Sequence, residues 1–361
     1  MERVVRVGIV GCGGIANGKH LPALSRIENV QMVAFCDLVA ERAEKAAKEY
    51  GVEGAAVYTD YKEMLDKEDL EVVHVLTPNK SHAPISIYAM EHDCHVMCEK
   101  PMAKTYADAK AMLEAHQRTG KKLTIGYQNR FRSDSTYLKK ACERGDLGEI
   151  YFAKAHAVRR RAVPTWGVFL NEEEQGGGPL IDIGTHALDL TLWCMNNYKP
   201  KAVKGSVFKK LGDHNDSGNA WGPWDPKEYT VEDSAFGFIE MEDGATIILE
   251  SSWALNTLDS KEARCTLCGT KAGADMDDSL RINSDDFGKL TTTKPELGAG
   301  GVDFFEGSSA RPEDIEARQW IRAVINDTDP VVKPEQAIVV TQILEKIYES
   351  ARTGKEVYFN D

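Results

Sequence analysis

Short apolar runs alternate with amphipathic segments through the first third of this 361-residue chain. The apolar runs are residues 4–10, 30–37, 71–79, 95–101 and 122–130, and the amphipathic segments are residues 39–50, 82–92 and 104–118. Strands that alternate with helices at a spacing of about 25 residues are typical of a parallel, doubly wound sheet with right-handed crossovers. The sequence therefore predicts an α/β fold for this part of the chain.

A glycine-rich turn, GCGGIA at residues 11–16, follows the first apolar run, and the second run ends at Asp37. Gly11 permits a tight turn, Gly13 lets the backbone approach a pyrophosphate, and Ala16 allows close packing of helix on strand. The N-terminus of the next helix offers free N–H groups to phosphates. The Asp37 carboxylate would accept hydrogen bonds from ribose hydroxyls and repel a 2′-phosphate. We therefore expect a Rossmann domain that binds NAD in preference to NADP; the alternative is a Rossmann-like fold without a cofactor.

Two polar tripeptides directly follow apolar strands: TPN at residues 77–79 and EKP at residues 99–101. In open α/β sheets the ligand lies outside the carboxyl ends of the strands, so both tripeptides are expected at the cofactor. Pro101 disfavours helix at Lys100 and holds that residue extended. The alternative interpretation is a surface pair of Glu99 and Lys100 that ends the strand.

The segment GGGPLIDIGTHALDL, residues 176–190, has the apolar content of a core helix. Yet Asp182, His186 and Asp189 fall at i, i+4 and i+7, which would place all three on one helix face. Pro179 suits the first helical position, and the helix dipole favours a carboxylate in the first turn. Burial of ionisable groups is costly unless they are paired or used. From the residues alone, a structural Asp–His pair and a functional site both remain open.

The composition limits the kinds of partner and the cellular compartment that we expect for this protein. The net charge of −13 argues against nucleic acid or an anionic membrane surface as the main partner. No signal peptide opens the chain, and no apolar run approaches the roughly 20 residues of a membrane span. Scattered cysteines in apolar runs indicate reduced thiols, so we expect a cytoplasmic protein. Cys265 and Cys268 form a CxxC without a second pair, and no metal site is expected.

Taken together, the motifs resemble the glucose–fructose oxidoreductase and inositol dehydrogenase (Gfo/Idh/MocA) family. The matching elements occur in the family's order and lie at residues 8–16, 37, 77–82, 99–101, 126–131 and 176–190. The resemblance implies an NAD-binding Rossmann domain, residues 1–126, and a C-terminal α/β domain, residues 127–361. The second domain is expected to hold a large, open, mostly antiparallel sheet that makes subunit contacts, so we expect a homo-oligomer: a dimer, a tetramer or a larger assembly.

The second half of the sequence agrees with that layout. Asp-Gly within residues 241–246 is a tight hairpin signal. A final amphipathic helix is predicted over residues 334–352. Strands are predicted over residues 149–159, 200–210, 234–241, 245–254 and 262–268.

The resemblance also implies a catalytic set of Lys100, Asp182 and His186 that projects towards the nicotinamide. An imidazole, whose ordinary pKa is about 6.5, suits a general base at neutral pH. His186 is therefore predicted to accept the proton of a substrate hydroxyl, and Lys100 to stabilise the developing alkoxide. Asp182 would orient both groups. Asp189, a further turn along, is predicted to be structural.

The residues and the resemblance together give two sets of contacts. The cofactor set is Gly11, Gly13, Gly14, Ile15, Ala16, Asp37, Arg42, Thr77, Pro78, Asn79, His82, Glu99, Lys100 and Gln128. The substrate set is Lys100, Tyr127, Asn129, Arg159, Trp166, Asp182 and His186.

The substrate predicted from these features is a small carbohydrate or polyol that loses a hydride from a ring secondary hydroxyl. We favour C3 of a sugar or glycoside; a cyclitol, an NAD-dependent redox-neutral glycosidase and a non-catalytic sensor remain as alternatives. Trp166 suits stacking on a pyranose, and the arginines at 159–161 suit either an anion site or an ion-paired face. Within the irregular stretch 211–230, Trp221 and Trp224 are either packing anchors or a lid.

Overall fold

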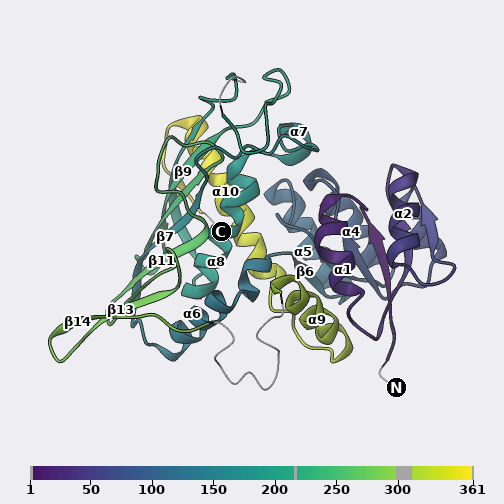
Figure 1. The fold of residues 1–361 in the computed structure, drawn as a ribbon, viewed down its shortest axis with the longest axis horizontal. Coiled ribbons are helices and arrows are strands. Elements are labelled where there is room, and N and C mark those ends of the chain that lie inside the picture. The colour runs from purple at the N-terminus through teal and green to yellow at the C-terminus, as the bar shows by residue number, and fades with distance from the viewer. Residues whose placement is uncertain (1–2, 215–217, 298–310, 360–361) are drawn as a thin grey trace. The chain divides into compact units, whose positions relative to one another are not determined.

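A computed structural model describes residues 3–214, 218–297 and 311–359. Its contacts divide the chain into two compact units. The first consists of Met1–Gln128 and Ala310–Ile338, and the second of Asn129–Ser309 and Val339–Asp361. Figure 1 shows the ribbon of both units, with elements labelled where there is room.

The first unit contains a six-stranded parallel sheet in the order β3-β2-β1-β4-β5-β6. The strand order reverses between β1 and β4, and such a reversal is where open α/β sheets bind their ligands. The strands are β1 (Val5–Val10), β2 (Val30–Cys36), β3 (Ala56–Tyr58), β4 (Val72–Val75), β5 (His95–Cys98) and β6 (Leu123–Ile125). The predicted doubly wound parallel sheet is confirmed.

The predicted amphipathic segments 39–50, 82–92 and 104–118 are helices α2 (Ala40–Tyr50), α4 (His82–Glu91) and α5 (Tyr106–Thr119). After the glycine-rich turn come the π-helical turn η1 (Ala16–His20) and α1 (Leu21–Leu24). The unit also contains α3 (Tyr61–Lys67), the 3₁₀ turn η2 (Asn79–Ser81) and α9 (Pro312–Ile325), which lie outside the predicted segments. From α9, Trp320 and Ile321 are buried in one core with Val7 and Ile9 of β1.

The second unit contains a nine-stranded sheet in the order β14-β13-β12-β11-β7-β10-β9-β8-β15. Only β7 and β10 pair in parallel among these neighbours, so the predicted mostly antiparallel sheet is confirmed. The strands are β7 (Ile150–Val158), β8 (Pro200–Phe208), β9 (Ser234–Met241), β10 (Thr246–Ser252), β11 (Glu262–Gly269), β12 (Gly273–Asp275), β13 (Arg281–Asp286), β14 (Lys289–Thr293) and β15 (Val357–Tyr358).

Helices α6, α8 and α10 lie along one face of this sheet (Figure 1). The helical elements of the unit are the 3₁₀ turn η3 (Gln128–Phe131), α6 (Ser133–Arg144), α7 (Glu172–Gln175), the π-helical turn η4 (Leu180–Gly184), α8 (Thr185–Met195) and α10 (Pro334–Thr353). Glycines in the strands allow α10 to pack closely on the sheet. A Cβ on Gly205 would lie 2.6 Å from Ile347 in α10, and a Cβ on Gly237 would lie 2.7 Å from the same residue. The same face of β7 carries the buried Ala153 and Ala155.

The structure differs from the expected division at residues 126/127 in one respect. The chain enters the second unit after Gln128, but residues 310–338 return to the first unit. The physical reason is the apolar face of α9, which packs against η1 and α1 and is buried in the same core as β1. None of the helices within the described ranges is both long enough and apolar enough to cross a membrane.

Candidate active site

The glycine-rich turn after β1 has the conformation that its sequence predicted. Gly11 has φ +94°, and a Cβ there would lie 2.7 Å from the backbone of Leu76, so only glycine fits. A Cβ on Gly13 or Gly14 would meet no atom within 4 Å, which leaves space for a ligand to approach the backbone. The Asn17 amide holds the turn by donating to the carbonyl oxygens of Cys12 and Gly13, both at 2.8 Å.

Asp37 lies beside this turn at the end of β2. Its Oδ2 accepts the N–H of Cys12 and its Oδ1 accepts the N–H of Val39, both at 2.9 Å. Each carboxylate oxygen can accept more than one hydrogen bond, so Asp37 keeps acceptor capacity for ribose hydroxyls. The neighbouring Leu38 is 91% exposed and offers no charge. Arg42 and Ile15, two more predicted cofactor residues, are exposed.

The TPN loop contains a correction to the predicted cofactor set. His82 is completely buried, and its ring nitrogens lie 2.9 Å from the carbonyl oxygen of Thr77 and 2.8 Å from that of Pro101. Burial lowers the pKa of His82. This histidine therefore connects the two loops at the carboxyl ends of β4 and β5 and has no surface for a direct cofactor contact.

The alternative of a surface pair of Glu99 and Lys100 is wrong. The Glu99 carboxylate is buried and lies 2.8 Å from both Lys19 Nζ and His20 Nε2. Burial would raise the pKa of Glu99, but the ammonium of Lys19 and the ring of His20 hold it well below its usual range. Its other oxygen accepts the backbone N–H of Lys100 at 3.1 Å. Glu99 thus anchors the backbone at Lys100, whose own side chain is half-buried.

Lys19 also contacts a second buried carboxylate, that of Glu316 in α9, at 2.9 Å. Burial raises the pKa of Glu316 to about 7 in spite of the attraction of Lys19. His74 lies next to His20, with their Nδ1 atoms 3.3 Å apart. This network could not be predicted from the sequence, because Glu316 is far along the chain from Lys19. The only signal was a Lys-His pair before the apolar residues at 21–24.

The helix that carries Asp182 and His186 begins with a π-helical turn, η4, and continues as α8. The buried Glu232 caps its start: Oε2 accepts the N–H of Gly178 at 2.8 Å and Oε1 that of Leu180 at 3.1 Å. Tyr348 donates to the same carboxylate at 2.8 Å. Burial raises the pKa of Glu232. This cap was also not predicted, because no local pattern around residue 232 indicates a contact with residues 178–180.

The three polar residues of this helix lie in different environments. Asp182 Oδ2 accepts the indole N–H of Trp253 at 3.0 Å, and its side chain is 15% exposed. His186 is half-buried one turn later. Asp189 is fully buried and accepts two hydrogen bonds from Arg130, at 2.5 and 2.9 Å. Asp189 therefore has the structural role that was predicted, whereas Asp182 and His186 keep accessible surface.

The predicted substrate residues also differ in accessibility. Trp166 is 51% exposed and Asn129 is half-buried. Tyr127 is completely buried, which leaves no surface for a substrate and corrects that prediction. Arg159 forms two hydrogen bonds of 2.6 Å with Glu262, so its charge is already paired and does not create an open anion site.

Comparison with known proteins decides the family. Residues 5–127 match the family model described as "Oxidoreductase family, NAD-binding Rossmann fold", and residues 136–275 match the "GFO/IDH/MocA C-terminal domain". A D-glucoside 3-dehydrogenase from Escherichia coli is 36% identical over 353 residues, which cover 98% of this chain and 97% of that protein. The chain belongs to the Gfo/Idh/MocA family.

Two further relatives indicate the range of this family. An inositol 2-dehydrogenase from Salmonella typhimurium is 32% identical over 202 residues, 55% of this chain and 57% of that protein. The crystal structure of an oxidoreductase domain protein from Kribbella flavida has a TM-score of 0.86 at 21% identity, with all of both chains covered. This member of the family is an oxidoreductase with an NAD-binding Rossmann domain.

The residues of the first unit fit NAD. The space over Gly13 and Gly14 would take the pyrophosphate, and Asp37 would take the ribose hydroxyls. Thr77 and Pro78 keep exposed surface at the end of β4, whereas Asn79 is buried. Gln128, half-buried in η3, is the last predicted cofactor residue of this unit. Lys100 belongs to the first unit, and Asp182 and His186 belong to the second.

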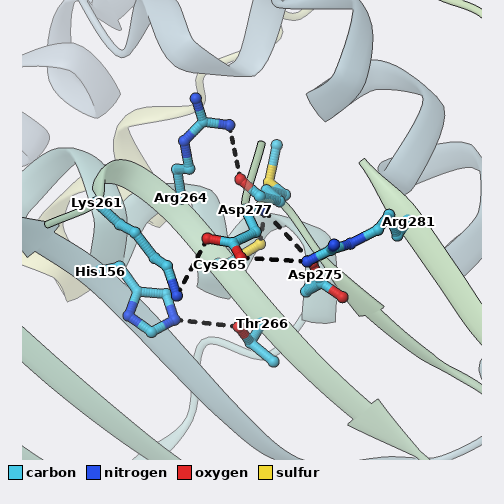
Figure 2. A pocket seen from close by; sticks show the side chains of 9 residues that line it. His156, Lys261, Arg264, Cys265, Thr266, Asp275, Asp277 and Arg281 are labelled. Atoms are coloured by element: carbon cyan, nitrogen blue, oxygen red, sulfur yellow. Dashed lines mark hydrogen bonds and ion pairs between the residues drawn. The ribbon is translucent and has the colours of Figure 1, made fainter. Parts of the chain in front are cut away.

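A cavity of about 100 Å³ on the second sheet is lined by none of these residues (Figure 2). Its charged side chains pair with one another: Lys261 with Asp277 at 3.2 Å, and Arg281 with Asp275 at 2.6 Å. It is lined by His156, Lys261, Arg264, Cys265, Thr266, Asp275, Met276, Asp277 and Arg281. Throughout the part of the chain that the structure describes, no group of three or more His, Cys, Asp or Glu is placed to hold a metal ion.

Proposed function

We propose that this protein is an NAD-dependent dehydrogenase that oxidises a ring secondary hydroxyl, at C3, of a D-glucoside. The observation that carries the proposal is the similarity to a D-glucoside 3-dehydrogenase along nearly the whole of both chains. Similarity over both units matters, because the Rossmann domain alone would not distinguish one substrate class from another.

The chemistry assigns a separate task to each residue of the catalytic set. Oxidation at C3 removes a hydride and a proton, and NAD, when bound, would supply the hydride acceptor. The hydroxyl proton passes to His186, and the oxygen becomes the carbonyl of a 3-keto product. The ammonium of Lys100 stabilises the developing alkoxide. Asp182, already held by Trp253, orients His186.

The anchoring of the Lys100 backbone supports the proposed role of its side chain in stabilising the alkoxide. The backbone N–H of Lys100 donates to the buried Glu99, and Glu99 is in turn fixed by Lys19 and His20. A catalytic cation benefits from such a rigid support, since small errors in position are costly to the rate.

A cyclitol is the second candidate substrate. The inositol 2-dehydrogenase relative supports it, but that similarity covers only 55% of this chain. A secondary hydroxyl on a six-membered ring is common to both substrate classes, so the same catalytic set would serve either. A panel of sugars, glycosides and cyclitols, followed by NADH absorbance, separates the two proposals.

We also propose that the protein acts as a homo-oligomer in the cytoplasm. All eight cysteines are free thiols, as expected in a reducing compartment. The second sheet keeps apolar side chains exposed on one face, which suits contacts between subunits.

The decisive experiment is the His186→Ala variant. We expect kcat to fall by about 10²- to 10⁴-fold while the Kd for NAD stays unchanged, because a general base acts only in the chemical step. The rising limb of the pH profile of kcat/KM should also disappear. His92→Ala, which removes a partly exposed histidine stacked on Tyr88, is the matched control and should keep wild-type kcat.

The opposite outcome has a clear signature. If His186 only packs, the His186→Ala variant will melt at a lower temperature but turn over substrate normally. Measurement of kcat, NAD affinity and melting temperature on one sample of each variant decides between the two roles.

A further inference from the structure

Two tryptophans of the second unit are exposed although they pack against each other. Trp166 is 51% exposed and Trp221 is 43% exposed. Their ring centroids lie 4.9 Å apart at an interplanar angle of 84°, and Trp166 also contacts Phe169 edge-on. Large aromatic rings with this much exposed surface are costly in water unless they bind something. We call this pair the aromatic shelf.

The two loops that carry the shelf are joined by hydrogen bonds. The hydroxyl of Thr165 donates to the carbonyl oxygen of Trp221 at 2.7 Å. The Asn219 side chain accepts the N–H of Val163 at 2.8 Å and donates to the carbonyl oxygen of the same residue at 3.0 Å. The backbone N–H of Ala220 donates to the carbonyl oxygen of residue 161 at 3.1 Å. The shelf is therefore a built surface whose rings are held in place before any ligand arrives.

Arg159 connects the shelf to the candidate active site. Its guanidinium lies over the ring of Trp221, 5.2 Å from the centroid. The same guanidinium has Nη1 4.0 Å from Asp182 Oδ2, and it is fixed on its other side by Glu262. One side chain thus separates the Asp182 carboxylate from the ring of Trp221.

Trp224 provides the contrast within the same irregular stretch. It is 5% exposed, and its indole N–H donates to the carbonyl oxygen of Gly212 at 2.8 Å. Its ring packs beside Tyr229, with centroids 5.8 Å apart. The structure thus distinguishes two tryptophans whose roles the sequence left open. Trp224 is a packing anchor, and Trp221 is available to a ligand.

We propose that the aromatic shelf binds the aglycone of a glycoside, through the apolar face of a ring attached at the anomeric carbon. The inference rests on the proposed function, because it takes the reacting sugar to lie at Asp182. Sugars and aryl groups both offer a flat apolar face to tryptophan, and neither brings a charge that the paired Arg159 would need to neutralise. On this proposal the enzyme is selective for glycosides with a ring aglycone over free sugars and methyl glycosides.

The test compares kcat/KM for methyl D-glucoside, which has no aglycone ring, with that for phenyl D-glucoside and for a glucosyl disaccharide. Wild type should favour the ring aglycones, chiefly through KM. In Trp221→Ala and Trp166→Ala the preference should fall by roughly 2- to 12-fold, the contribution of one aromatic contact. Trp221→Phe keeps a ring and should retain most of the preference. Tyr151→Ala, which removes an aromatic side chain of similar exposure (54%), is the matched control and should keep the wild-type preference.

Each outcome has a distinct meaning. If the tryptophan variants lose the preference for phenyl D-glucoside alone, the shelf binds aryl aglycones. If they also lose the preference for the disaccharide, the shelf binds either an aryl or a sugar ring. An equal loss of kcat/KM for all three substrates, or no loss for any, refutes the shelf while the proposed function stands. If wild type oxidises none of the glucosides, the proposed function fails. Calorimetric titration of wild type and Trp221→Ala with phenyl and methyl D-glucoside then decides the shelf by itself, and equal affinities would refute it.

Discussion

The Asp37 carboxylate has two kinds of partner, and this determines how its role is tested. It accepts backbone N–H groups from Cys12 and Val39, which shape the glycine-rich turn, and we propose that it also binds the adenosine ribose. Replacement by alanine would remove the charge and also the hydrogen bond that holds the turn. Asparagine removes the charge and keeps one oxygen acceptor, so it separates the two effects more cleanly.

We therefore predict that Asp37→Asn narrows the preference for NAD over NADP by about tenfold or more. The reason is relief of a like-charge repulsion of the 2′-phosphate, which at a protein surface amounts to ~1–4 kcal/mol. The measurement is kcat/KM with each cofactor. Asp60→Asn, a change at the N-cap of α3 in the same unit, should leave the ratio unchanged. Equal wild-type efficiency with both cofactors would contradict the assignment of Asp37.

At the scale of elements, α9 is attached to the residues that follow the glycine-rich turn. Lys19 of η1 contacts Glu316, and Arg26, just after α1, forms an ion pair with Asp314. Glu316 is 4% exposed, and burial raises its pKa to about 7. In the unfolded chain the same carboxyl would titrate near its ordinary value of about 4.3. Between these pH values the folded protein holds a proton that the unfolded chain does not.

The sign of the resulting pH dependence follows from linkage. The contribution of Glu316 to the free energy of unfolding is fully present below about pH 4 and is lost as pH rises towards 7. We predict that the melting temperature of Glu316→Gln, relative to wild type, increases by several degrees between about pH 4 and about pH 7.5, which bracket the two pKa values. Glu53→Gln, a change at an exposed glutamate in the turn after α2, is the control and should show no such trend. If the melting temperatures of Glu316→Gln and wild type differ by the same amount at every pH, the raised pKa of Glu316 is contradicted.

Most elements could be predicted from the sequence because their apolar residues follow one period. The predicted strand over residues 234–241 is β9, and the predicted helix over residues 334–352 is α10. Strands β13 and β14 were not predicted, since their side chains are mostly exposed or half-buried and carry no apolar alternation.

The helix of Asp182 shows a different limit. A period of 3.6 residues was assumed, but η4 is a π-helical turn. Its start is capped by Glu232, and Ser251 donates to the carbonyl oxygen of Pro179 at 2.7 Å. These partners come from β10 and from the segment before β9, and no local pattern identifies them. For the same reason the sequence located Glu99 at the site but not the buried Lys19, His20 and Glu316 that fix it.

For the whole molecule, the second sheet offers a surface for the proposed contact between subunits. Gly205 and Gly237 face α10, so their neighbours along the strands point to the opposite face. That face carries an apolar group in which Phe238 is 51% exposed and Phe208 is 40% exposed. Ile248 is paired opposite Phe238, and the ring of Phe236 contacts that of Phe208. Exposed apolar groups on an open sheet favour association.

We predict that the wild-type protein is a dimer, a tetramer or a larger homo-oligomer, and that Phe238→Lys shifts it towards monomer. A lysine at the centre of this face would bury an unpaired charge in the contact, a cost of about 3–5 kcal/mol in well-packed interfaces. The measurement is light scattering after size-exclusion chromatography across micromolar concentrations. Leu258→Lys changes a residue that is 85% exposed in a loop, and it should keep the wild-type mass. A wild-type monomer at these concentrations would refute the association. If Phe238→Lys remains an oligomer, the subunits contact each other through another surface.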